Sequence, residues 1–134
     1  GTFLLSQKWV HNLSDFNALS VGGQERVIGW TKPDSVELTG DAMPETSHVS
    51  RTDVKQDGVA FKIYRRSFPF GGASEHGLYF LAFSCDPIRF DVMLQRMYGV
   101  SGDNLSDKLI NFSKAVTGSY WFDPSLEDLE QALR

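Results

Sequence analysis

The chain has 134 residues, of which 41% are hydrophobic and 22% are charged, close to the average of globular domains. Its net charge of −4 argues against nucleic acid as a main partner, because phosphate binding needs a concentrated basic surface. The longest apolar stretch, Leu78–Phe83, is far too short to span a membrane, and Gly1–Val10 lacks the pattern of a signal peptide. The single cysteine, Cys85, excludes an internal disulfide and predicts a buried, inert thiol at a strand end.

The first fifty residues predict a strand, a helix and a long loop. Thr2–Val10 has the composition of a strand with apolar side chains on both faces. After capping residues at 12–15, Ser20–Trp30 is predicted as a helix that two adjacent glycines weaken. Thr31–Ser50 has no periodicity and contains two prolines, so we expect a loop that is functional or mobile.

Two strands and a helix are predicted next. Val59–Ser67 and Leu78–Cys85 read as strands joined by the turn-rich segment Pro69–Ala73. Leu78–Cys85 is apolar on both faces, so either face could be core or the wall of an apolar cofactor pocket. Pro87 then opens a helix with apolar residues at helical spacing.

The C-terminal part predicts a shorter helix over Asp103–Ser113, a short aromatic strand over Ser119–Phe122 and a terminal helix over Pro124–Arg134. The resulting order is β-α-β-β-α-β, the ferredoxin-like pattern of the α+β class with an antiparallel sheet. Repeats, low-complexity segments and internal linkers are absent, so residues 1–134 are predicted to form one domain.

The strand Val59–Ser67 carries a cation where an apolar side chain is expected. Period-two alternation puts Arg65 in register with Phe61 and Ile63, so its guanidinium is predicted to point inward. A buried charge is costly unless an anion or polar cavity receives it. The sequence therefore predicts either a buried salt bridge or a site that stabilises negative charge on oxygen.

Three histidines are present, and His48 is the candidate metal ligand. A loop histidine is more often solvated or hydrogen-bonded than a ligand, but haem iron needs only one protein ligand, commonly histidine. His11 follows a strand and His76 lies in a turn, and neither has a second feature that points to chemistry.

Six segments resemble the carboxyl-terminal half of dye-decolourising peroxidases: VHNL, QERVIGWTKPDS, SHVSR, IYRRSFPFG, EHGLYFLAF and VTGSYWFDPS. They occur in order over nearly the whole chain. The resemblance implies a haem-dependent peroxidase with haem b as cofactor, which uses hydrogen peroxide to oxidise phenolic or dye-like donors in one-electron steps.

The same resemblance implies roles for individual residues. His48 would be the proximal ligand and Arg65 the distal arginine above the iron. The other matching positions are Ser67 as a polar residue of the distal pocket, Leu78 and Phe80 as its apolar wall, and Asp107 as the acceptor of the proximal histidine's second N–H. Such a carboxylate fixes the imidazole tautomer and raises its basicity.

The chain departs from the family at two points. The Gly-x-x-Asp-Gly motif, whose aspartate works with the distal arginine on peroxide, is absent. Trp30 stands where the family usually has an arginine that meets a haem propionate, and Lys32 or Lys8 could compensate. These departures favour an alternative: a non-catalytic haem-binding or assembly module that lacks the distal acid.

Partners follow from the resemblance as expectations. We expect peroxide and an aromatic donor as substrates, and either the missing N-terminal half or a second copy of the chain, with a homo-oligomer in a cytoplasmic setting. Four aromatic residues could relay electrons to the surface or could simply pack: Tyr64, Tyr98, Tyr120 and Trp121.

Overall fold

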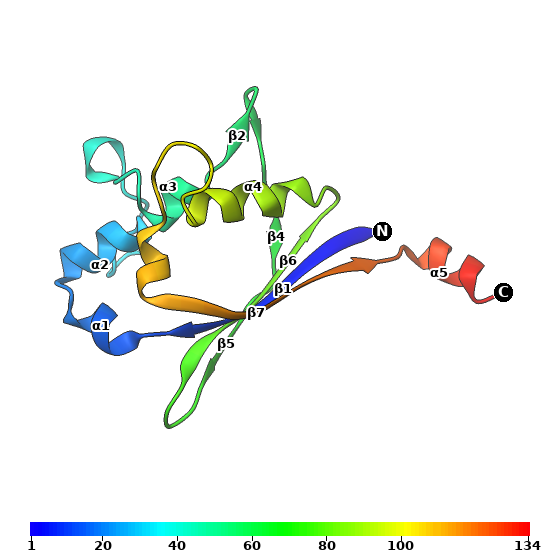
Figure 1. Ribbon diagram of the computed structural model, residues 1–134, viewed down its shortest axis with the longest axis horizontal. Helices are drawn as coiled ribbons and strands as arrows, with labels where there is room; N and C mark the ends of the chain where they lie inside the picture. Colours follow the sequence, from blue (N-terminus) through cyan, green and yellow to red (C-terminus); the bar gives the residue numbers. More distant parts are fainter.

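The computed structural model describes all residues 1–134 and shows an antiparallel sheet with helices on one face (Figure 1). The long strands are β1 (Thr2–His11), β6 (His76–Ser84) and β7 (Ser113–Asp123). β1 lies between β6 and β7, and the short strands β4 (Tyr64–Arg65) and β5 (Phe68–Gly71) both pair with β6. The mixed helix and strand architecture with an antiparallel sheet confirms the predicted fold class.

Alternation along β1 decides which side chains the helices cover. Leu5, Gln7 and Trp9 are buried, while the residues between them are more exposed. Residues directly opposite in an antiparallel pair share a face. Leu5 pairs with Ala82 of β6, and Ala82 pairs with Arg65 of β4, so these three residues form one row on the helical side of the sheet.

The helical layer consists mainly of α2 (Val21–Ile28), α3 (His48–Thr52) and α4 (Ile88–Met97), which lie on the same side of the sheet in Figure 1. The order of the remaining helices is α1 (Leu13–Ala18) after β1, the 3-10 turns η1 (Gly40–Ala42) and η2 (Lys108–Asn111), and α5 (Leu126–Ala132) after β7. Phe90 of α4 packs on Leu5 and Ala82, and these three buried residues form the central core cluster.

Helix boundaries follow local capping. Ser20 caps α2 by accepting a hydrogen bond from the backbone N–H of Gly23, and Gly29 ends it with φ 99°. The helix predicted over Ser20–Trp30 is therefore present but stops two residues early, because only glycine adopts that conformation at little cost.

Val59–Ser67 is not one strand. Val59–Ala60 forms β3, which pairs with β2 (Lys55–Gln56) in a separate hairpin, whereas Tyr64–Arg65 pairs with β6. The hairpin turns through Asp57 and Gly58, both at positive φ. An Asp-Gly pair is a strong hairpin signal, and this local turn takes the first part of the segment away from the main sheet.

Three further expectations in the chain were wrong in extent. Pro69–Ala73 is not only a turn, because β5 pairs with β6 as far as Gly71 and the turn follows at 72–75. The short strand predicted at Ser119–Phe122 is part of the eleven-residue β7, which β1 pairs along its length. The terminal helix is shorter than predicted and is limited to α5.

The helix predicted over Asp103–Ser113 is wrong. Gly102 and Asn104 have positive φ values of 95° and 58°, which interrupt a helical path. The carboxylate of Asp103 instead accepts hydrogen bonds from a buried arginine, and only the short turn η2 remains of the predicted helix.

Cys85 is exposed, so the expectation of a buried thiol was wrong. It lies just after β6, where the chain turns towards α4, and it therefore lacks the cover that β6 receives from its neighbours. No helix of the chain is both long and apolar enough to cross a bilayer.

The sheet face opposite the helices has no cover within the chain. Its exposed aromatic side chains come from four strands: Tyr64, Phe68, Tyr79 and Trp121 are between 48% and 60% exposed. Tyr64 packs beside Phe83 at 6.3 Å between ring centroids, so the aromatic surface is continuous across neighbouring strands.

Candidate functional site

A cavity of about 850 Å³ lies between the helical layer and the sheet. Seventeen of its 27 lining residues are hydrophobic, which suits a large, mostly apolar ligand. Of the residues predicted for the site, five line it: His48, Arg65, Ser67, Leu78 and Phe80. Four elements supply much of its facing walls, with α3 and α4 on one side and β4 and β6 on the other.

His48 is not a loop residue as expected but the first residue of α3. Ser47 caps this helix by accepting a hydrogen bond from the backbone N–H of Ser50 at 3.2 Å, which starts the helix at His48. The capping serine was the sequence signal for this turn. His48 therefore lies at the N-terminus of a short helix, with 27% of its side chain exposed.

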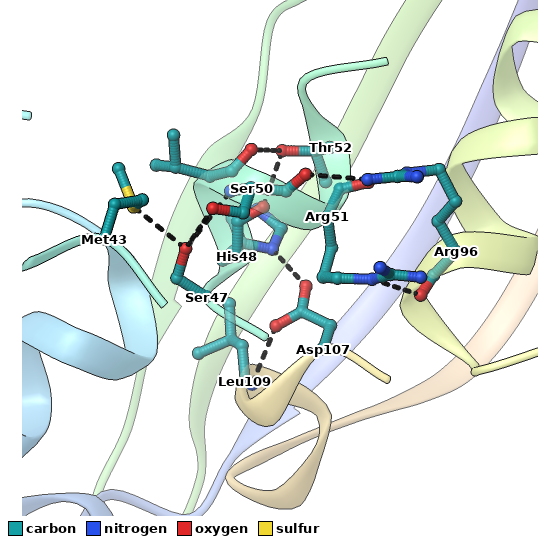
Figure 2. Close-up of polar contacts among 10 residues, drawn as sticks. Met43, Ser47, His48, Ser50, Arg51, Thr52, Arg96, Asp107 and Leu109 are labelled. Carbon is teal, nitrogen blue, oxygen red and sulfur yellow. Dashed lines mark hydrogen bonds and ion pairs between the residues drawn. The ribbon is translucent and has the colours of Figure 1, made fainter. Parts of the chain in front are cut away.

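The His48 ring is held by a buried carboxylate. Its Nδ1 lies 2.6 Å from Oδ2 of Asp107, a residue with no exposed surface (Figure 2). The other oxygen of Asp107 accepts the backbone N–H of Leu109 at 2.8 Å. Beside an ionised carboxylate, which only accepts hydrogen bonds, the ring donates from Nδ1, and no hydrogen bond within the chain engages its Nε2.

Arg65 faces the same cavity from the sheet. Contrary to expectation its side chain is exposed, and it makes neither an ion pair nor a side-chain hydrogen bond. Of the two alternatives for Arg65, the buried salt bridge is therefore absent. Its place in the row with Ala82 and Leu5 puts it on the helical side of the sheet, and the short β4 leaves it at the sheet edge where solvent reaches it.

The apolar part of the cavity comes from both layers. Leu78 and Phe80 of β6 lie opposite Trp9 and Gln7 of β1, on the face that the helices cover. Ser67 Oγ accepts the backbone N–H of Leu81 at 3.3 Å, so it helps to hold the edge of the sheet beside Arg65.

Trp30 also lines the cavity and is 40% exposed, close to where α2 ends. Neither proposed compensating lysine lines it. Lys8 pairs with Glu75 at 3.3 Å, and Lys32 donates to Oε1 of Gln24 at 2.8 Å. Lys62 does line the cavity. Sequence reasoning missed this cation because period-two alternation puts it on the face opposite Arg65.

His11 is a second histidine of the cavity that the sequence did not single out. Its Nδ1 lies 2.6 Å from Oγ of Ser113, its strand partner on β7. Burial lowers the pKa of His11 below the ordinary 6.5. The pairing of β1 with β7, more than a hundred residues away, explains why no local signal marked it.

The donor set fits one kind of metal complex. No three His, Cys, Asp or Glu side chains lie together to hold a metal ion. A free imidazole nitrogen beside an apolar cavity is what a metal carried inside its own organic macrocycle requires, and haem iron is the common case. His48 and His11 both line the cavity, and His48 is the stronger candidate because a buried carboxylate holds its ring.

Comparison with known proteins identifies the family. A family described as Dyp-type peroxidase, C-terminal, matches residues 1–128, and the chain belongs to this family. A dye-decolorizing peroxidase of Mycobacterium tuberculosis is 40% identical over 92% of the chain, and one of Rhodococcus erythropolis is 34% identical over 96%. The chain spans 38–39% of the length of these two relatives.

Solved structures agree with this assignment. A dye-decolorizing protein from Vibrio cholerae (V. cholerae) is 46% identical, with a TM-score of 0.91 over 97% of this chain and 43% of its own. A variant of DypB from Rhodococcus jostii in complex with heme is 39% identical, with a TM-score of 0.92 over 96% of this chain and 43% of its own.

Proposed function

We propose that this chain is the haem-ligating part of a dye-decolourising peroxidase, with residues 1–134 as one ferredoxin-like domain and haem b as cofactor. The observation that carries the proposal is the His48–Asp107 pair at 2.6 Å beside a cavity of about 850 Å³. Bound haem would supply the redox chemistry of peroxide cleavage and of one-electron oxidation of phenolic or dye-like donors.

His48 would hold the iron through Nε2. Because Asp107 accepts the hydrogen bond from Nδ1–H, the ring keeps one tautomer and gains basicity, which strengthens a metal–imidazole bond. Leu78 and Phe80 would exclude water from the cavity that holds the macrocycle, and Ser67 would offer a hydroxyl there.

Arg65 would act on the oxygen substrate. Its guanidinium has no partner within the chain, so it is free to stabilise negative charge that develops on a peroxide oxygen. A guanidinium stays protonated, so it cannot serve as the base that moves the peroxide proton. That step needs a carboxylate, and the Gly-x-x-Asp-Gly motif that would supply it by the family resemblance is absent from these residues.

The uncovered sheet face supports a partner. Exposed aromatic side chains on four strands form an apolar surface of the kind that marks an interface. We propose that the part of the protein outside these residues, or a second copy of the chain in a homo-oligomer, covers this face. A cytoplasmic location remains a prediction from the sequence.

One observation favours the non-catalytic alternative. Trp30 lines the cavity, at a position where the family resemblance leads us to expect an arginine, and an indole has no positive charge to form an ion pair with a propionate. Lys62 could take over this pairing, because it also lines the cavity and has no ion-pair partner within the chain. If neither residue compensates, the chain would bind haem or assemble without supporting turnover.

The test is a haemin titration of the protein, followed by its Soret absorption, with His48→Ala and His11→Ala in parallel. We expect a stoichiometric, shifted band that His48→Ala abolishes and His11→Ala retains, because both histidines line the cavity but only His48 has a carboxylate on its ring. Binding that is indifferent to His48 would contradict the proposed ligand.

A second measurement separates the peroxidase from the binding module. In haem-loaded protein of natural length, Arg65→Lys should slow the reaction with peroxide by about a hundredfold, because lysine keeps the charge but loses the fork of donors. An unchanged rate would remove Arg65 from the chemistry and favour the non-catalytic alternative.

A further inference from the structure

The short helix α3 carries a second polar residue that the proposed function does not use. Arg51 lies three positions after His48, so the two side chains leave neighbouring sides of the same turn. Both contact the segment 99–107, which joins α4 to η2: His48 through Asp107, and Arg51 through Asp103.

Arg51 is 2% exposed and all of its donor nitrogens are engaged. Nη1 and Nη2 reach the two carboxylate oxygens of Asp103 at 2.8 and 3.1 Å, which is a bidentate ion pair. Nη2 also donates to the carbonyl of Leu105 at 3.0 Å and to Ser101 Oγ at 3.3 Å. One side chain therefore fixes three points of the segment 99–107.

Arg51 also joins α3 to α4. Its Nε donates to the carbonyl of Arg96 at 2.9 Å, and Arg96 Nε donates back to the carbonyl of Arg51 at 2.9 Å. A second bond runs from Arg96 Nη2 to the carbonyl of Ser50 at 2.9 Å. Figure 2 shows these two arginines lying against each other beside the His48–Asp107 pair.

The position of Asp107 depends on the path of this segment. Its backbone N–H donates to the carbonyl of Met97 at 2.8 Å, and the next residue, Lys108, donates to the carbonyl of Thr46 at 2.9 Å. On the other side the segment is held by Asp103, whose pKa is well below its usual range, chiefly because of the hydrogen bond from Arg51. Asp107 is thus fixed between two anchors.

We propose that the Arg51–Asp103 ion pair is a positioning element for His48: it fixes the segment 99–107 so that Asp107 Oδ2 accepts the hydrogen bond from Nδ1–H, which is the tautomer that leaves Nε2 available to a metal. The pair touches neither the cavity nor the ring. It acts through the backbone that carries Asp107. The proposal rests on the proposed function for its purpose, since a fixed tautomer matters most when the free nitrogen binds a metal.

The first test reads the tautomer of His48 directly, by ¹⁵N NMR of the imidazole nitrogens in the haem-free protein. We expect a single Nδ1–H tautomer in the wild type and a mixture in Asp103→Asn and in Arg51→Met. Asp107→Asn is the positive control. Because haem is absent, this result stands or falls independently of whether the protein is a peroxidase.

Arg96→Met is the matched control. It removes two hydrogen bonds between α3 and α4 but none to the segment 99–107. We expect it to lower the melting temperature without changing the tautomer. Wild-type tautomers in Asp103→Asn and Arg51→Met would overturn the proposal, and so would an equal change in Arg96→Met, because the effect would then be general loosening of α3.

The second readout uses the haem-loaded protein. In Asp103→Asn the hydrogen bond from His48 Nδ1–H to Asp107 should be weaker. The iron–histidine stretching frequency of the ferrous form should therefore fall, and the reduction potential of the haem should rise. Haem affinity should fall about tenfold, the lower end of what loss of an outer partner of a metal ligand costs. A stretching frequency equal to that of the wild type would contradict the positioning role.

Discussion

The two walls of the cavity hold their charged side chains in opposite ways. On the helical side, His48 lines the cavity and pairs with Asp107 behind it, and Arg51 pairs with Asp103 deeper in the same layer. Asp107 and Arg51 are fully buried. On the sheet wall, Arg65 has no partner and is exposed. A buried charge must be paired as the chain folds, whereas an exposed one tolerates having none. Folding alone therefore fixes the positions of the charged side chains on the helical side, whereas Arg65 on the sheet side needs a ligand or a partner protein to fix its position.

The largest effect is expected at the helical wall. Asp107→Ala removes the acceptor of both His48 Nδ1 and the Leu109 N–H in a site without solvent. The free energy of unfolding should fall by roughly 2 to 4 kcal/mol, measured by urea denaturation. Asp91→Ala is the control, because that acid accepts only an exposed hydrogen bond from Gln95. A loss no larger than in this control would break the contrast between the walls.

A smaller effect should appear as a pH dependence at the far end of the sheet wall. Burial lowers the pKa of His11 below 6.5, so the unfolded chain takes up a proton that the folded chain resists. The stabilisation by neutral His11 is present in full above pH 6.5 and is lost as the pH falls below that value. His11→Gln should therefore flatten the fall in melting temperature on acidification. If the melting temperatures of the variant and the wild type fell equally with pH, the proposed contribution of His11 would be wrong.

The smallest effect on stability is expected at Arg65. Because this side chain makes no ion pair or hydrogen bond, Arg65→Met should change the free energy of unfolding by no more than about 0.5 kcal/mol. The same variant should weaken the binding of small anions such as azide to the haem-loaded protein. A destabilisation well above 1 kcal/mol would show that Arg65 has a structural partner and that the walls are alike.

The elements predicted correctly are those with a strong local signal. Alternation marked β1, and Pro87 with its apolar spacing marked α4. The break in Val59–Ser67 was missed although Asp57-Gly58 announces a hairpin, because the period-two pattern continues across it. Period-two alternation predicts which face of a sheet each side chain lies on, but it does not predict which strand the segment will pair with.

The candidate site was predictable only where the resemblance pointed to single residues. Residues alone did not indicate that His48 would meet Asp107, which is 59 positions away. Arg51 was missed completely, because its partners lie 45 to 54 positions along the chain and no periodicity marks it. Arg65 was placed on the correct face by alternation, but its exposure depends on β4 being short, which the sequence did not reveal.

The central position of β1 has a consequence for how the chain reaches its native state. Its partner β7 pairs Thr2 with Asp123, so β1 acquires this neighbour only after the residues up to Asp123 have been synthesised. Folding dominated by such distant pairings is slow, and an unpaired strand is prone to associate with other chains in the meantime. During synthesis, the edge of β1 that pairs with β7 therefore stays unpaired until β7 has been made. We expect chaperone binding to this edge to be most important during that interval.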